Sequence, residues 1–109
     1  MSTRCHIAKK INEEEAEYIY CHFDGSHITA KFLHDNYRDE KKVDQLLNLG
    51  DISSLGHDTY HTIAYFRDRG ETLNPKGIRT IADLKQDQEV DCYHLFNPQT
   101  NEWTWGFTC

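Results

Sequence analysis

The sequence contains no apolar run near the roughly 18 residues that a membrane-spanning helix needs, and its mean hydropathy is −0.78. Its first residues, Met1 to His6, include no apolar segment of the kind that marks a secretory signal. These absences exclude a helical membrane span and predict a soluble, intracellular protein.

Positive charge is also scarce. The 109 residues include 12 Lys and Arg against 18 Asp and Glu, which gives a formal net charge of −6. Nonspecific binding of nucleic acid draws on Lys and Arg against phosphate, so this composition argues against direct contact with DNA or RNA. An acidic surface instead suits solubility, or docking on a basic partner.

The local motifs of the common enzyme classes are missing as well. There is no phosphate-binding loop, no dinucleotide-binding fingerprint and no nucleophile elbow, and the carboxylates are scattered in turns. A thiolate activated by a histidine is a further route to catalysis, but no cysteine is placed at a predicted helix N-terminus. We therefore predict no catalytic residue, no cofactor and no enzymatic activity.

None of the four cysteines belongs to a C-x-x-C pair, and without a secretory signal we expect reduced thiols. Histidines adjoin three of them, in the segments Cys5-His6, Cys21-His22 and Cys92-x-His94. Neighbouring residues of a strand point to opposite faces, so a four-ligand zinc site across paired strands would need Cys92 and His94 as well. We favour core cysteines and predict no metal ligand, with a zinc-stabilised structural module as an open alternative.

What the sequence does contain is a pattern of short strands and helices, with 12% aromatic residues, too many for a disordered chain. We predict a first strand within 2–11, further strands over 18–23, 62–66, 90–96 and 102–107, and helices over 26–37, 39–49 and 80–86. These elements predict a single α+β domain over residues 1–109, with about five antiparallel strands and two to three helices packed on one side.

Some positions have specific expected roles. Asp39 is expected to cap the second helix, and Gly50 to follow its end. Trp103, Trp105 and Phe107 share one face of the last strand, so we expect them in the core.

A long polar segment, 67–77, follows the strand predicted at 62–66, and loops of this length often carry function. Arg67 and Arg69 would leave the strand end on the same side and form a fork that grips phosphate or carboxylate, held in place by the acidic residues beside them. Ion pairs in a solvated loop are the alternative explanation. The ligand-binding residues we predict are Arg67, Asp68, Arg69, Glu71, Tyr20 and His22.

Three ordered segments carry a resemblance. They read I-Y-C-H-F-D-G at 19–25, L-N-L-G-D-I-S-S-L-G at 47–56 and F-R-D-R-G-E at 66–71. In these segments, and in register over about residues 3–109, the chain resembles a widespread family of small proteins encoded by phages, prophages and other mobile elements. It departs from the family pattern by having Phe23 in place of a Trp, and Ser26-His27 in place of Tyr-Pro.

The resemblance implies no enzyme activity. It implies a setting in the cytoplasm of a bacterial host, because small accessory phage proteins often neutralise host immunity. We therefore expect an anti-CRISPR-like inhibitor that binds a defence effector protein, such as a CRISPR–Cas subunit, and blocks its engagement of nucleic acid. The acidic residues expected to bind this partner are Glu13, Glu14, Glu15, Asp35, Asp39 and Glu40.

An alternative of a different class is a sponge that sequesters a nucleotide immune signal. Arg67 and Arg69 would bind its phosphates, and Tyr or Trp rings would stack on its bases. A domain of this size has little room for a deep pocket, so such a site would form between subunits of a homo-oligomer.

Overall fold

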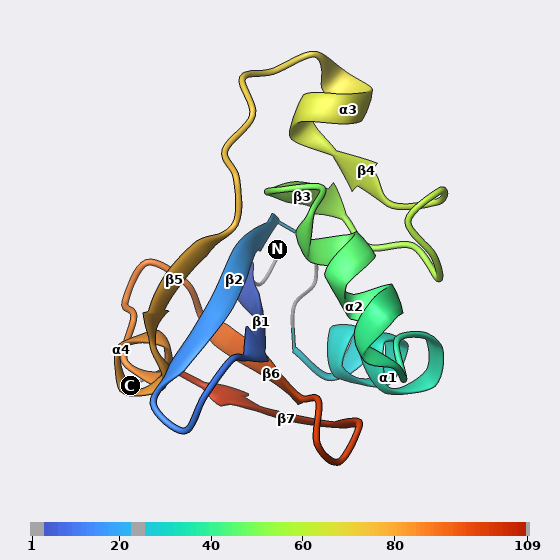
Figure 1. The fold of residues 1–109 in the computed structure, drawn as a ribbon. Coiled ribbons are helices and arrows are strands. Elements are labelled where there is room, and N and C mark those ends of the chain that lie inside the picture. Colours follow the sequence, from blue (N-terminus) through green and yellow to red (C-terminus); the bar gives the residue numbers. More distant parts are fainter. Residues whose placement is uncertain (1–3, 23–25, 109) are drawn as a thin grey trace.

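The computed structural model describes residues 4–22 and 26–108, and within them it has seven strands and four helices (Figure 1). The strands are β1 (Arg4–Lys10), β2 (Glu15–His22), β3 (Ile52–Ser54), β4 (Ile63–Ala64), β5 (Gly77–Thr80), β6 (Cys92–Asn97) and β7 (Glu102–Phe107). The helices are α1 (His27–Asn36), α2 (Glu40–Leu47), α3 (Tyr65–Arg69) and α4 (Ile81–Lys85). No helix among these residues is long and apolar enough to span a membrane.

One mixed sheet joins the strands in the order β4-β3-β2-β1-β6-β7, with β5 also paired to β2. β1 pairs antiparallel with β2 on one side and parallel with β6 on the other. Ile7 of β1 therefore lies opposite Ile19 of β2 and His94 of β6. The α+β class is therefore confirmed, but the expected sheet of about five antiparallel strands is wrong. A parallel neighbour arrives through a long crossover connection, which local sequence patterns do not reveal.

Strand alternation gives the two faces of the sheet different partners. Cys5 and Ile7 of β1 face α1 and α2, whereas Ala8 faces α4 and packs with Leu84. The larger core lies on the first face, and its buried members are Cys5, Ile7, Ile19, Cys21, Leu33, Tyr37, Val43, Leu46, Leu47, Ile52, Leu55, Ala64, Cys92 and Phe96. Helices cover both faces, so the expectation that they pack on one side is wrong.

Two strands share one edge of β2. β5 pairs with its first half, and β3 pairs near its other end, at Cys21. In the gap between them, the backbone N–H of Tyr20 donates to Oδ1 of Asp51 at 3.0 Å, and Asn74 Nδ2 donates to Oδ2 at 2.7 Å. The Asp51 carboxylate thus takes the place of a strand at this point of the edge.

The predictions for the second helix are confirmed. α2 begins directly after Asp39, whose Oδ1 accepts a hydrogen bond from the backbone N–H of Lys42 at 2.8 Å. Gly50 follows the helix with a φ of 75°, a conformation that favours glycine.

The predicted C-terminal hairpin is also present, as antiparallel β6 and β7. Trp103 and Trp105 pack against the larger core, as expected, whereas Phe107 is 59% exposed and its core assignment is wrong. β7 is an edge strand, and there the Phe107 ring packs against Trp105 at 5.5 Å between ring centroids.

The middle of the chain departs most from prediction. The strand predicted at 62–66 is limited to Ile63–Ala64, and α3 follows at once. The connector 51–56 contains β3, and the polar segment 67–77 runs into β5. These strands are two to four residues long, so they carry almost no alternation to detect. The predicted strand end at Phe23 and the turn at Asp24-Gly25 lie outside the described residues.

We expect Leu46→Ala to lower the free energy of unfolding by about 2–5 kcal/mol, because Leu46 is fully buried and its truncation leaves a cavity in the larger core. Leu73→Ala removes the same atoms from a side chain that is 41% exposed, and should cost about 1 kcal/mol or less. Urea denaturation followed by circular dichroism measures both. Equal losses in the two variants would contradict this difference in burial.

Candidate functional site

Some of the predicted ligand-binding residues lie in the region where β2, β3 and α3 meet. Alternation along β2 turns Tyr20 and His22 away from the larger core, and the Tyr20 hydroxyl lies 2.7 Å from Nδ1 of His22. Burial raises the pKa of Tyr20, and the nearby Tyr65 phenol adds to the effect. Tyr20 therefore stays a neutral hydroxyl at ordinary pH, able to donate a hydrogen bond.

α3 supplies the basic side of this region. The Arg69 guanidinium lies over the Tyr65 ring, 5.3 Å from its centroid, and its Nη1 is 3.5 Å from Ser53 Oγ. Glu71 pairs with Arg69 at 3.4 Å between Oε2 and Nε, and both side chains are 52% exposed. We call the following set the β2–α3 corner: Tyr20, His22, Ser53, Tyr65 and Arg69.

Arg67 is not part of this corner, because its guanidinium is bound into the protein. Nη2 donates to the carbonyl oxygens of Thr59 at 2.7 Å and Thr62 at 2.6 Å, and it lies 2.9 Å from Oδ2 of Asp68. Asp68 in turn accepts a hydrogen bond from the backbone N–H of Ala64 at 2.8 Å. The hydrogen bonds from Arg67 and Ala64 hold the pKa of Asp68 below its usual range.

The geometry expected of the arginine fork is therefore wrong. Arg67 and Arg69 lie on a helix, where residues two apart point to roughly opposite sides, and not at a strand end, where they would share a side. Hydrogen bonds of Arg67 and Asp68 connect the 59–62 segment to α3, while Arg69 and Glu71 stay at the surface. A ligand-binding role for the β2–α3 corner stays a prediction.

Two of the acidic residues expected to bind a partner, Glu40 and Glu13, pair with the last two residues of β1, and this end of β1 is remote from α3 (Figure 1). Lys9 bonds Glu40 at 3.0 Å and the next residue, Lys10, bonds Glu13 at 3.2 Å. The two lysine side chains are 10% and 23% exposed, whereas those of Glu40 and Glu13 are 51% and 84% exposed. Lys9 and Lys10 thus lie beneath the carboxylates of Glu40 and Glu13, whereas Lys31, which pairs with Asp35, is 81% exposed. We call the following set the acidic end: Glu13, Glu14, Glu15, Asp35, Asp39 and Glu40.

Lys9 anchors α2 to the sheet. Its Nζ lies 2.6 Å from Oδ1 of Asp44, in addition to the bond with Glu40. Burial alone would lower the pKa of Lys9, but the hydrogen bonds and charges of Asp44 and Glu40 outweigh it and raise that pKa. Of the other acidic residues, Asp39 caps α2 and Asp35 pairs with an exposed lysine of α1.

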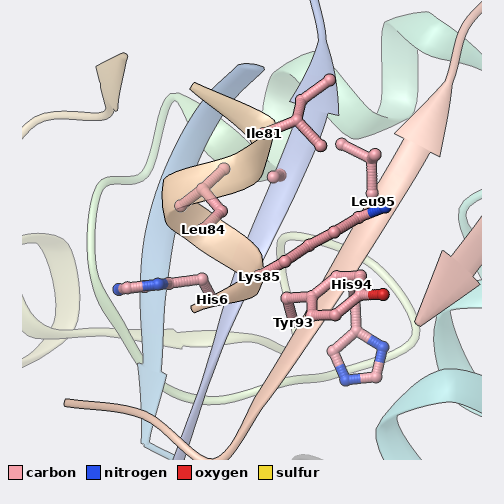
Figure 2. Close-up of a pocket in the computed structure, with 8 residues that line it drawn as sticks. His6, Ile81, Leu84, Lys85, Tyr93, His94 and Leu95 are labelled. Carbon is pink, nitrogen blue, oxygen red and sulfur yellow. The ribbon is translucent and has the colours of Figure 1, made fainter. Parts of the chain in front are cut away.

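On the face of the sheet away from the larger core, α4 closes over β1 and β6 (Figure 2). Leu84 lies between the helix and the strands, and Lys85 extends over Tyr93, with Nζ 5.7 Å from the ring centroid. His94 points to the opposite side of β6 (Figure 2). The space under α4 is too narrow to admit a water molecule, so it is a packed cluster and not a ligand pocket.

A buried charged cluster borders α4. Nδ1 of His6 lies 3.6 Å from Oδ2 of Asp87, and Arg79 donates a hydrogen bond of 2.5 Å to the same oxygen. Burial lowers the pKa of His6, against the opposing charge of Asp87. Burial alone would raise the pKa of Asp87, but hydrogen bonds from the Glu89 N–H and from Arg79 hold it below its usual range. The cluster therefore keeps Asp87 charged and His6 neutral.

The three cysteines among the described residues lie in the core, as predicted, whereas Cys109 lies outside those residues. Cys5, Cys21 and Cys92 lie side by side on three neighbouring strands, all buried, with Cys5 opposite both of the others. His94 shares their face of the sheet, whereas His6 lies on the other. A hydrogen bond with Cys21, and burial, raise the pKa of Cys5 well above its ordinary value. This disfavours the thiolate that nucleophilic attack requires.

Sequence reasoning missed one cluster. Within residues 4–22 and 26–108, the group of His, Cys, Asp or Glu side chains whose ligand atoms converge closely enough for a metal ion is His57, Asp58 and His61. The available signal was the spacing H-D-x-x-H, in a segment that was expected only to lead into a strand.

Comparison with family models, with curated proteins and with solved structures yields no match for this chain. Its function is therefore inferred from the α+β fold and from the two surfaces just described, the acidic end and the β2–α3 corner.

We expect Arg67→Ala to lower the free energy of unfolding by about 1–3 kcal/mol, because it leaves the carbonyl oxygens of Thr59 and Thr62 without their charged donor. Arg69→Ala, the matched control on the same helix, should change it by about 0.5 kcal/mol or less. Urea denaturation of both variants measures the difference. An Arg67→Ala variant as stable as the wild type would show that the hydrogen bonds of Arg67 contribute nothing to the free energy of unfolding.

The His6 cluster predicts a pH dependence of stability. The unfolded chain takes up a proton on His6 near about pH 6.5, whereas the folded protein resists it to lower pH. The contribution of neutral His6 to the free energy of unfolding is therefore present above that pH. It is lost as the pH falls toward the lower pKa that His6 has in the folded protein. We expect His6→Gln to flatten the decline in unfolding free energy between about pH 7 and 5.

Urea denaturation at a series of pH values tests this expectation. His34→Gln, at a histidine whose side chain is 66% exposed, should keep the wild-type decline. Asp87 titrates below its ordinary value of 3.8, outside this window. A decline that is unchanged in His6→Gln would refute the assignment to His6.

Proposed function

We propose that this is a phage-type accessory protein that inhibits a bacterial defence system by binding an effector protein, in the manner of an anti-CRISPR protein. It would act in the cytoplasm of the bacterial host, on a CRISPR–Cas subunit whose basic nucleic-acid-binding surface it occupies. The observation that supports this most is the construction of the acidic end. The carboxylates of Glu40 and Glu13 face solvent while Lys9 and Lys10 lie beneath them, which suits a basic partner.

The acidic end is held in place before any partner arrives. Asn12 Oδ1 accepts hydrogen bonds from the backbone N–H groups of Glu14 and Glu15, both at 2.8 Å, and the Glu14 carbonyl accepts one from Ile81 at 2.7 Å. Lys9 and Lys10 fix two further carboxylates. Side chains that are already positioned lose less entropy on binding, which favours affinity.

A specific interface would take only a modest share of the surface of this protein. The molecule exposes 6212 Å², and a standard interface takes about 800 Å² from each partner, or about one eighth of this surface. One end of the protein is therefore large enough for the contact, and the proposal requires no catalytic residue.

The second candidate is the nucleotide sponge, acting through the β2–α3 corner. It is supported by Arg69, which lies over the Tyr65 ring on the side of the sheet that carries Tyr20 and His22. A guanidinium beside aromatic rings suits the phosphate and base of a nucleotide. Arg67 no longer contributes to it, because its guanidinium is bound to backbone carbonyls.

Protection of a phage from CRISPR–Cas interference tests the proposal. In a panel of bacterial hosts that carry different CRISPR–Cas systems, we expect the wild-type protein to restore plaque formation by the targeted phage in at least one. Glu14→Lys should weaken binding to that effector by about tenfold or more, because tenfold is only about 1.4 kcal/mol and a like-charge contact costs several. Binding is measured with purified effector complex.

Glu71→Lys is the matched control, since it makes the same charge reversal on a glutamate at the far end of the molecule. It should bind the effector as the wild type does, and so should Arg69→Ala. The sponge would replace the effector inhibitor if two results were found together. Plaque formation would still be restored by Glu14→Lys but not by Arg69→Ala, and the purified protein would release a nucleotide on heating. Failure in every host would contradict both the anti-CRISPR assignment and its partner.

A further inference from the structure

The segment between β3 and β4 brings three ligand-type side chains together. The ligand atoms of His57, Asp58 and His61 all lie within 4.8 Å of one another. Nδ1 of His61 is 2.8 Å from Oδ1 of Asp58, and Nε2 of His57 is 3.5 Å from Oδ2. The carboxylate thus lies between two imidazole nitrogens, and one oxygen faces each of them.

The backbone that carries these side chains is closed into a tight turn. The Asp58 carbonyl accepts hydrogen bonds from Thr62, at 3.1 Å from its backbone N–H and 2.8 Å from its hydroxyl. The backbone N–H of His61 donates to the Asp58 side chain at 2.9 Å. These bonds fix the spacing of Asp58 and His61 without using the His61 ring nitrogen that faces the carboxylate.

The rest of the protein holds this turn from outside. Lys42 Nζ donates to the His57 carbonyl at 2.9 Å, and Arg67 donates to the carbonyls of Thr59 and Thr62. A Cβ atom built on Gly56 would lie 2.4 Å from the carbonyl carbon of His61, so only glycine allows this close approach. Exposed loops are seldom tied at so many points, and preorganised ligands are what a metal site needs.

We propose that His57, Asp58 and His61 form a binding site for a divalent ion of a late first-row transition metal, with zinc as the representative. Imidazole nitrogens suit Zn²⁺, Ni²⁺ and Cu²⁺, and a carboxylate oxygen is a common third ligand. Three protein ligands leave coordination positions for water or for a side chain of another molecule.

The geometry requires only small side-chain movements to close around an ion. Ligand atoms at about 2.0–2.2 Å from one ion lie about 3–3.5 Å apart, and those here already lie within 4.8 Å of one another. The three side chains are 57%, 38% and 52% exposed, so the rings can rotate without displacing the core. The His57 and His61 rings already stack, with centroids 4.3 Å apart.

The charge state of the carboxylate also suits a cation. Hydrogen bonds from the His61 side chain and backbone hold the pKa of Asp58 below its usual range, so it is ionised at ordinary pH. The comparison within the molecule is His34 and Asp35, an exposed pair at 3.3 Å on α1 that has no second imidazole beside it. That pair should not bind a transition metal tightly, and it provides the control.

Isothermal titration of the purified full-length protein with ZnCl₂ tests the proposal. We expect one zinc per chain in the wild type and in His34→Gln. His57→Gln and His61→Gln should each weaken binding by about tenfold or more, since loss of even an outer partner of a metal ligand costs about 10–100-fold. Asp58→Asn keeps an oxygen for the His61 N–H and should weaken binding as well. Urea denaturation without metal checks that the exposed substitutions leave the fold intact.

Absorption spectroscopy with Co²⁺ distinguishes this site from the buried cysteines. Binding at His57, Asp58 and His61 should give cobalt bands without the thiolate-to-metal absorption that cysteine ligands produce. The proposal is overturned if the wild type binds no zinc, if the two histidine variants bind it as tightly as the wild type, or if the cobalt spectrum shows thiolate ligation.

Discussion

The hydroxyl of Tyr37 donates a hydrogen bond of 2.8 Å to the carbonyl oxygen of Gly56, from a side chain that is completely buried. The Tyr37 carbonyl accepts a hydrogen bond of 2.7 Å from Nε1 of Trp103. One residue between α1 and α2 thus joins the loop before β4 to strand β7. A buried hydroxyl without a partner costs about 1–3 kcal/mol, so the position of the Gly56 carbonyl is closely constrained.

That constraint extends along the 56–62 loop to Thr62 and to the turn that begins at Asp58. Burial raises the pKa of Tyr37, in opposition to its hydrogen bond with Thr62, so the phenol remains a donor. Thr62 in turn closes the turn that begins at Asp58, and Arg67 holds the same turn from α3. A loop with little regular structure is therefore as well connected as a strand, because side chains make the bonds that a ladder would otherwise make.

Local sequence signals predicted the elements that depend on neighbouring residues. Asp39 capped a helix as expected, and the C-terminal hairpin and the short helix α4 were found in place. The partners of β1 were not predictable in this way, since the parallel pairing with β6 joins segments more than eighty residues apart. The same limit applies to Arg67. Its sequence neighbours suggest a ligand-binding fork, but its bonds are to carbonyls that only the folded chain brings near.

The candidate site also has parts that the sequence could predict and parts that it could not. The acidic residues were recognisable from composition, but their exposure above Lys9 and Lys10 follows from the register of β1 against α2 and the hairpin. His57 and His61 lie in a segment that was expected only to lead into a strand, although four-residue spacing within a turn brings imidazoles close together. Separation along the chain therefore explains why the surroundings of the acidic residues were not predicted, but the missed histidine cluster is local in sequence.

The Asp51 carboxylate, which fills the gap between β3 and β5 on the edge of β2, also bears on how these molecules behave toward one another. An N–H left open on a sheet edge is a template on which another chain can add a strand, and such additions lead to aggregation. Here the Tyr20 N–H is occupied, and the occupant carries a negative charge that an incoming backbone carbonyl would have to displace. The Asp51 side chain thus disfavours edge-to-edge self-association at the point where the sheet is interrupted.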